Sequence, residues 1–265
     1  VLSINNYAFR YCKSLVSIDI PNSVKHIGRE AFAGCHSLAT IRISESVTSI
    51  GSSAFSDCYA LKDICIPASI TRIEEYTFYN CISLSRIVIP DSVTFIGGLS
   101  FCGCKSLEKI EIPESVIGIG YGAFNCCCNI CSIVVGKNNS TYHSRDSCNA
   151  IIETSSNRLV KGCQNSIIPN GVKEIEDYAF SDCKGMVSII IPDSVTIVGK
   201  GVFSGCISLS EVVLPDSIIN IKDDVFEGCE ILNSIIIPKG SKGKFKKLLP
   251  NYKNKLIESQ KSRQN

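Results

Sequence analysis

The segment Leu84–Cys104 reads LSRIVIPDSVTFIGGLSFCGC, and its first residues set the local structure. From Arg86 to Ile89 the chain alternates between outward and inward positions, with Ile87 and Ile89 facing inward, which predicts a short β-strand. Pro90 ends this strand, because proline has no N–H group to contribute to a ladder of hydrogen bonds.

The rest of the segment predicts a second extended piece followed by a turn. Val93 and Ile96 face inward, and Gly97 permits a bend that bulkier residues disfavour. Phe101 and Cys104 then face inward before the next repeat begins. These few inward residues cannot form a core alone. We therefore expect copies of this unit to stack and bury these residues against each other.

A phenylalanine followed three residues later by a cysteine recurs along the chain. The step is 23 residues, except for a single step of 56, and the phenylalanines are Phe9, Phe32, Phe55, Phe78, Phe101, Phe124, Phe180, Phe203 and Phe226. A fixed period in this range is typical of a solenoid, in which strands of successive coils pair about 4.8 Å apart. We therefore predict a β-rich solenoid of about ten coils with a parallel strand face.

The single long step marks a degenerate repeat at residues 136–163, which holds about ten residues more than the others. Within it, Ala150–Glu153 and Arg158–Lys161 read as two strands joined by a polar turn. This pattern predicts a β-hairpin that projects from the coil. The stretch Cys163–Pro169 aligns with the strand-face segments of the other repeats, and we expect a strand there.

The period stops at Pro238. Apolar residues then recur at helical spacing, which predicts a short helical cap. Pro250 interrupts any single helix there. The apolar residues are Phe245, Leu248, Leu249, Tyr252 and Leu256. Residues 239–265 hold nine Lys and Arg against one Glu, a local charge of +8 in a chain of formal net charge +2. We interpret residues 1–238 as the solenoid and residues 239–265 as a basic cap and tail.

Composition argues against nucleic acid and membrane as partners. The basic end lacks the interleaved aromatic platform that stacks on bases, and no run of 18 apolar residues exists that could span a bilayer. The first residues, VLSINNYAF, match the second half of a repeat. We therefore expect the natural chain to begin earlier, and the lack of a signal peptide at this start says little about compartment.

The repeat string L-x-x-I-x-I-P-x-S-V-x-x-I-G-x-x-A-F-x-x-C occurs with small departures at Leu61–Cys81 and Leu209–Cys229. It resembles the BspA-like (Treponema pallidum-type) leucine-rich repeat family, as do the degenerate repeat and the end PKGSKGKFKKLLPNYKNKL, residues 238–256. The resemblance implies a right-handed leucine-rich repeat superhelix without shared catalytic residues. It also implies a surface or secreted protein of a host-associated microbe, and some members resemble adhesins.

The residues show no constellation typical of catalysis or of cofactor binding. The three histidines are scattered, and neither a Ser/His/Asp arrangement nor a phosphate-binding loop is present. Single carboxylates occur at turns, where their side chains suit turn chemistry; examples are Asp91, Asp193 and Asp216. We expect a protein that is not an enzyme and needs no cofactor.

The cysteines could be metal ligands, disulfide partners or core residues. The recurring ones face inward at a fixed place, which favours small buried hydrophobes, and parallel stacking gives poor geometry for disulfides. The CCCNIC stretch at Cys126–Cys131 lacks the second CxxC of a zinc site. Cys148 and Cys163 flank the hairpin, so a bridge between them is a candidate in an oxidising compartment.

Repeat proteins bind partners on the extended strand face, so its outward, non-repeating positions are the candidate contacts. The first half of this face is charged and mixed, and the second half is apolar; the candidates are Asp63, Arg86, Val88, Lys109, Glu111, Val134, Ile190, Val213 and Ile236. Exposed apolar area of this kind marks contact sites. Alternatively, the β-branched residues only favour strands, or the hairpin or C-terminal segment covers them.

Together these features favour a non-enzymatic binding or adhesion module outside the cell or at its surface. Its partner would be a protein or glycan, such as a host matrix or cell-surface component. The alternative is an intracellular protein-interaction scaffold of the same fold, which the 16 cysteines would suit.

Overall fold

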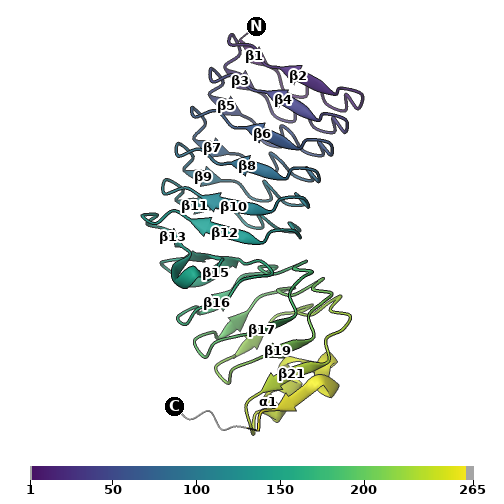
Figure 1. Cartoon of the computed structure of the whole chain (residues 1–265), viewed down its shortest axis with the longest axis vertical. Helices are drawn as coiled ribbons and strands as arrows, with labels where there is room; N and C mark the ends of the chain where they lie inside the picture. The colour runs from purple at the N-terminus through teal and green to yellow at the C-terminus, as the bar shows by residue number, and fades with distance from the viewer. Residues whose placement is uncertain (1, 261–265) are drawn as a thin grey trace. The chain divides into compact units, whose positions relative to one another are not determined.

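The computed structural model describes residues 2–260. The chain divides into two compact units, residues 1–143 and residues 144–265. In each unit, short parallel strands recur along stacked coils, and the only α-helix of the described residues lies near the C-terminal end (Figure 1). This architecture confirms the predicted β-solenoid.

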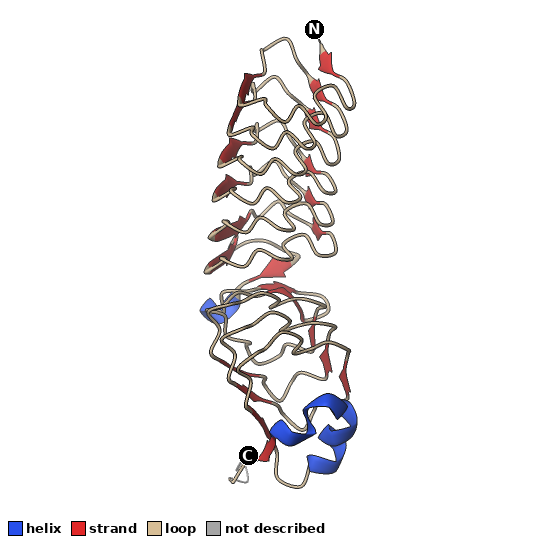
Figure 2. Cartoon of the chain, turned by 90° about the vertical axis from the view of Figure 1, so that its right-hand side faces the viewer, coloured by secondary structure: helices blue, strands red, loops and turns tan. Residues whose placement is uncertain are grey.

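Each regular coil of the first unit contributes two short strands. The longer strands form the strand face: β2 (Ser17–Asp19), β4 (Thr40–Arg42), β6 (Asp63–Cys65), β8 (Arg86–Val88), β10 (Lys109–Ile112) and β12 (Ser132–Val135). The others form the short-strand face: β1 (Ser3–Ile4), β3 (His26–Ile27), β5 (Ser49–Ile50), β7 (Arg72–Ile73), β9 (Phe95–Ile96), β11 (Gly118–Ile119) and β13 (Tyr142–His143). Figure 2 shows the two sets on two sides of the coils. Strands pair in parallel one period apart, as with Ile110 opposite Ile133.

The second unit repeats this arrangement. Its strand face consists of β17 (Ser188–Ile190), β19 (Glu211–Val213), β21 (Ser234–Ile237) and β22 (Leu256–Glu258), and its short-strand face includes β16 (Glu174–Ile175), β18 (Ile197–Val198) and β20 (Asn220–Ile221). The strand expected at Cys163–Pro169 is absent, so that prediction was wrong. The N–H of Ile167 instead donates to the carbonyl oxygen of Cys148 at 3.0 Å, and a short 3-10 helix, η1 (Arg145–Ser147), precedes that residue.

The predicted hairpin is present as β14 (Ile151–Glu153) and β15 (Arg158–Lys161), which pair antiparallel. It does not project from the coil as expected, because β15 also pairs in parallel with β16. Ile152 and Leu159 are fully buried. The hairpin therefore supplies the short-strand face of the degenerate repeat.

Aromatic rings form the centre of each core. In the first unit the rings from Phe9 to Phe124 stack one period apart, with centroids 5.1 to 5.7 Å apart and nearly parallel planes. In the second unit Phe180, Phe203 and Phe226 continue the pattern at 5.6 and 5.7 Å. Each ring lies against a copy of itself, so one residue type at one position fills the core of every regular coil.

The recurring cysteines form a second ladder beside these rings. Cys183 follows the degenerate repeat, which lacks the phenylalanine. Each of the other buried ladder thiols donates a hydrogen bond to the carbonyl oxygen of the phenylalanine one coil earlier, as from Cys58 to Phe32 at 3.3 Å and from Cys206 to Phe180 at 3.2 Å. The same carbonyl accepts the N–H of the cysteine in its own coil. The prediction of core thiols holds for these residues, but Cys12 is exposed. The sequence pattern did not indicate that the thiols also link successive coils.

Gly97 has a different role from the bend that the sequence suggested. Its backbone runs directly over the preceding coil, and a Cβ atom built on it would lie 2.5 Å from the nitrogen of Glu75 and 2.6 Å from the carbonyl carbon of Glu74. Both obstacles are backbone atoms that cannot move aside. Gly97 is therefore required by the close approach of two coils.

The C-terminal cap contains α1 (Lys242–Leu248) and the 3-10 helix η2 (Pro250–Lys255), which confirms the predicted helical cap. Phe245 and Leu249 are buried in the core of the second unit, and the Tyr252 ring meets the Phe226 ring edge-on at 5.4 Å. Leu256, expected at helical spacing, instead begins β22. The boundary between a solenoid of residues 1–238 and a basic cap and tail of residues 239–265 remains a prediction.

Candidate ligand-binding surface

The predicted contact residues occupy outward positions on the strand faces of both units. Val88, Val134 and Ile190 expose 72%, 46% and 63% of their surface. The charged residues Asp63, Arg86, Lys109 and Glu111 are also exposed, whereas Val213 and Ile236 are half-buried. Alternation in a strand explains the placement, because the residue between two inward isoleucines must point to solvent.

In the first unit, the structure brings three of these residues to one depression of about 710 Å³. Val88, Glu111 and Val134 line it from three successive coils, with Asp91 and Glu114 at its rim. Lys109 forms an ion pair with Glu111, and Asp63 lies opposite Arg86 in the register of β6 and β8. Asp63, Arg86 and Lys109 do not line this depression.

In the second unit, four aliphatic residues stand in one row across the strand face. Ile190 lies opposite Val213, Val213 opposite Ile236, and Ile236 opposite Ile257 of β22. Ile257 exposes 49% of its surface and was missed from the sequence, because the segment was expected to be helical. The alternation of buried Leu256 with exposed Ile257 was the signal that could have placed it.

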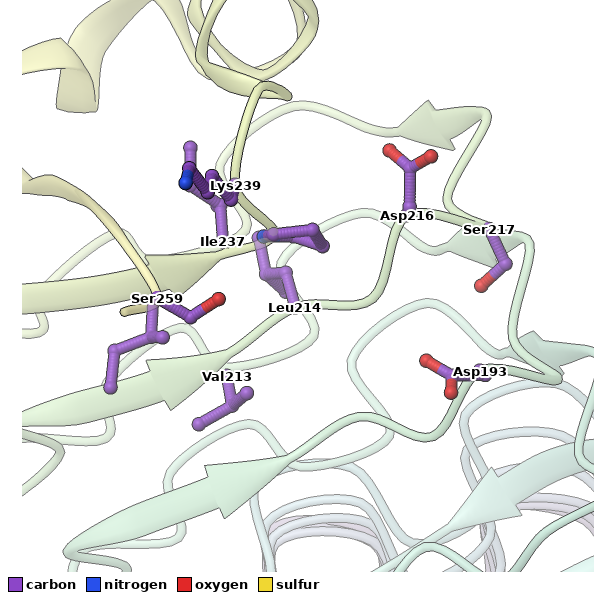
Figure 3. A pocket seen from close by; sticks show the side chains of 10 residues that line it. Asp193, Val213, Leu214, Asp216, Ser217, Ile237, Lys239 and Ser259 are labelled. Carbon is purple, nitrogen blue, oxygen red and sulfur yellow. The ribbon is translucent and has the colours of Figure 1, made fainter. Parts of the chain in front are cut away.

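A pocket of about 500 Å³ adjoins this row where β19 and β21 end (Figure 3). Val213, Leu214, Ile236, Ile237 and Pro238 form its apolar wall. Asp193, Asp216, Ser217, Lys239 and Ser259 supply its polar groups. Apolar walls with a few polar groups are the usual composition of binding pockets.

The turns after β17 and β19 each contain a proline followed by an acidic residue and a serine, which place Asp193, Asp216 and Ser217 in the lining of the pocket. The Ser217 hydroxyl donates to the carbonyl oxygen of Val195 in the preceding coil at 2.6 Å, so the serine links coils while the carboxylate before it stays at the surface. Lys244 of the cap donates to the backbone carbonyl of Asp216 and to its Oδ1, at 3.3 Å to the latter. The cap thus fixes one edge of the pocket.

The same turn forms the depressions of the first unit. Glu45 lines a further depression of about 730 Å³ beside Ile43 and Arg42, and Asp91 and Glu114 flank the one beside Val88. The sequence assigned Asp91, Asp193 and Asp216 to turn chemistry alone. Their recurrence at the ends of the strands places carboxylates along one border of the strand face in each unit.

The cysteines do not provide a metal centre in the described part of the chain, where no three His, Cys, Asp or Glu side chains are placed to hold a metal ion. Within CCCNIC, Cys127 is buried and donates to the Phe101 carbonyl oxygen at 3.1 Å, whereas Cys126 and Cys131 are exposed. Burial raises the pKa of the ladder thiol Cys229 to about 11, so this thiol stays protonated and inert near neutral pH.

Cys148 and Cys163 are both buried beside the hairpin. The Cys148 thiol donates to the carbonyl oxygen of Ala150 and the Cys163 thiol to that of Asn149, at 3.8 and 3.7 Å. The bridge between these two cysteines remains a prediction.

No helix between residues 2 and 260 combines the length and the apolar character needed to cross a membrane. The fold and its strand faces define a leucine-rich repeat protein. A family model of the BspA type leucine rich repeat region matches residues 2–130, 71–158 and 151–251. The chain therefore belongs to the BspA-type leucine-rich repeat family.

Two solved structures are similar to this chain. A leucine rich cell surface protein from Faecalibacterium prausnitzii is 31% identical, with a TM-score of 0.73 over 99% of this chain and 78% of that chain. The pneumococcal vaccine antigen PcpA is 21% identical, with a TM-score of 0.72 over 89% of this chain and 67% of that chain; it shows similarity of fold alone. No match is found among the curated proteins.

Proposed function

We propose that this chain is a non-enzymatic binding module that holds a protein ligand on its strand face, at the cell surface or outside the cell. The observation that carries the proposal is the aliphatic row Ile190, Val213, Ile236 and Ile257, which continues across four paired strands. A row of this kind, partly exposed and bordered by charged residues, is typical of interaction sites.

The chemistry of the row favours a polypeptide over a glycan. Aliphatic side chains gain free energy by excluding water from apolar groups of a partner, whereas sugar hydroxyls need hydrogen-bonding groups to replace water. Four strands spaced about 4.8 Å apart give a row about 14 Å long, which four or five extended residues of a ligand would cover. The similarity to a cell surface protein supports the proposed location.

The exposed cysteines favour one alternative, an intracellular scaffold that binds through the same face. Cys12 and Cys65 are exposed, and exposed thiols persist more readily in a reducing compartment. Thiol counting on protein from its natural source separates the two locations: oxidation or capping of these two side chains supports the extracellular proposal, and two unmodified thiols support the alternative.

The test selects peptides from a random phage-displayed library on the wild-type chain and measures their binding to variants. Ile190→Asp, Val213→Asp and Ile257→Asp combined should abolish binding while the circular dichroism spectrum stays unchanged. The matched control combines Ile117→Asp and Ile219→Asp, because these isoleucines expose 63% and 68% of their surface on the turns before β11 and β20. The control should bind like the wild type.

Two outcomes contradict the proposal. Peptides that bind the triple variant as well as the wild type would show that the strand face is not the site. If the wild type retains no peptide but binds a glycan on an array, a protein ligand is the wrong class.

A further inference from the structure

Two cysteines in the turns of neighbouring coils of the first unit, Cys102 and Cys126, lie in contact and do not belong to the ladder of recurring thiols. Cys102 belongs to the coil of Phe101 and exposes 9% of its surface, and Cys126 belongs to the next coil and is exposed. The Cys102 thiol donates a hydrogen bond to the Cys126 side chain, which together with burial raises the pKa of Cys102. The ladder thiols Cys183 and Cys206 also share a side-chain hydrogen bond, but both are buried, so the exposure of Cys126 distinguishes the Cys102–Cys126 contact.

The backbone places the two cysteines beside adjoining peptide groups of neighbouring coils. The N–H of Gly103 donates to the carbonyl oxygen of Asn125 at 2.9 Å, so Cys102 and Cys126 adjoin two peptide groups that are hydrogen-bonded to each other. A disulfide would require the α-carbons of Cys102 and Cys126 to lie roughly 4.4 to 6.8 Å apart. Cys126 has a positive φ of 57°, which fixes the direction of its Cβ.

We propose that Cys102 and Cys126 form a redox-active dithiol, which low-molecular-weight disulfides such as oxidised glutathione convert to an intramolecular disulfide. The exposed Cys126 thiolate attacks the oxidant, forms a mixed disulfide and releases one reduced glutathione. Cys102 then loses its proton and attacks the Cys126 sulfur, which expels the second glutathione. The pair gives up two electrons and two protons, and both glutathione molecules leave reduced.

The surroundings separate this pair from the other cysteines. Cys104 and Cys127, its neighbours in sequence, are buried, and their thiols donate to the carbonyl oxygens of Phe78 and Phe101 at 3.2 and 3.1 Å. Cys65 is exposed on the strand face, opposite Val88 rather than another cysteine. Only a thiol that is both accessible and beside a second thiol can complete both steps.

The test incubates the reduced full chain with oxidised glutathione, quenches with acid and an alkylating agent, and maps the products by mass spectrometry. Cleavage after Lys105 and Lys109 separates Cys102 from Cys126, so a bridge links two peptides and fragmentation locates it. At this pair the wild type should lose both thiols, retain no glutathione, and yield the Cys102–Cys126 link.

Variants resolve the two steps. Cys102→Ser should keep one glutathione on Cys126, because the second attack is lost, and Cys126→Ser should leave Cys102 unmodified. Cys65→Ser is the matched control and should form the bridge like the wild type. A wild type that retains glutathione on Cys126 while Cys102 stays alkylatable overturns the proposal, as does a link that joins other cysteines. The wild-type mapping decides this even if a variant fails to fold.

Discussion

The thiol of Cys81 donates a hydrogen bond of 3.1 Å to the carbonyl oxygen of Phe55, one coil earlier. That carbonyl also accepts the N–H of Cys58 within its own coil, at 3.2 Å. Burial raises the pKa of Cys81 well above its ordinary value, so the thiol stays a donor throughout the physiological range. Cys81 therefore both fills the core and links one coil to the next, as do the other buried cysteines that follow a coil with a phenylalanine.

This double role predicts the order of two substitutions at Cys81. Cys81→Ala removes the sulfur and the donor and should lower the free energy of unfolding by about 1–3 kcal/mol. Cys81→Ser keeps a donor and should be less destabilising than alanine by about 0.5–1.5 kcal/mol. Urea unfolding checks both, with exposed Cys65→Ala as control. If serine is worse than alanine, the thiol acts only as an apolar filler.

The close approach of coils at Gly97 predicts that a single methyl group is costly there. Gly97→Ala would push the backbones of two neighbouring coils apart and should destabilise the first unit by about 1–3 kcal/mol. The control is Gly243→Ala in α1, where a Cβ would meet nothing within 4 Å; it should be neutral or stabilising by up to about 1 kcal/mol. Thermal unfolding of both variants measures the difference, and equal midpoints would refute the steric account.

Lys161 of β15 predicts a stabilising substitution. The side chain exposes only 2% of its surface, and its Nζ has no hydrogen-bond partner among residues 2–260. An unsatisfied buried donor costs about 1–3 kcal/mol, so Lys161→Met should raise the free energy of unfolding by about that amount. Lys105→Met, at an exposed lysine, should change it by less than about 0.5 kcal/mol. A destabilised Lys161→Met would show that the ammonium is stabilised in the folded chain.

Asp177 predicts a pH dependence of stability. Partial burial would raise the pKa of its carboxyl, but the Lys200 N–H at 2.8 Å and the Lys222 Nζ at 2.9 Å donate hydrogen bonds to its Oδ1 and hold the pKa below the ordinary 3.8. A depressed pKa stabilises the fold above the unfolded-state value, and this stabilisation is lost as pH falls through the folded-state value. Asp177→Asn should thus cost about 0.5–1.5 kcal/mol at pH near 7 and less in acid. A cost that does not change with pH contradicts this assignment.

The period of Phe and Cys was enough to predict the solenoid, because the same type of residue fills the same buried position in each regular coil. Ile87 and Ile89 marked β8 by alternation alone, and the outward Val88 between them is exposed in the structure. Irregular parts were harder. Cys163–Pro169 keeps the strand pattern, yet its Ile167 hydrogen-bonds to Cys148, since tertiary contacts override a short local preference.

The pocket beside Val213 could not be predicted from the repeat. Its lining combines turn residue Asp216, strand residue Ile236 and Ser259, which follows β22. The helical spacing of the cap residues concealed this last strand. The exposures of Val213 and Ile236 are likewise set by neighbours that become adjacent only when the coils stack.

The central claim is that the strand face of the second unit holds the ligand. The most direct measurement is photo-crosslinking of a selected peptide that carries a benzophenone group, followed by mass-spectrometric mapping on the full chain. The account predicts crosslinks within Ser188–Ile190, Glu211–Val213 and Ser234–Ile237, which form the strands of that face. Crosslinks on the short-strand face, at Ile197–Val198 or Asn220–Ile221, would contradict it.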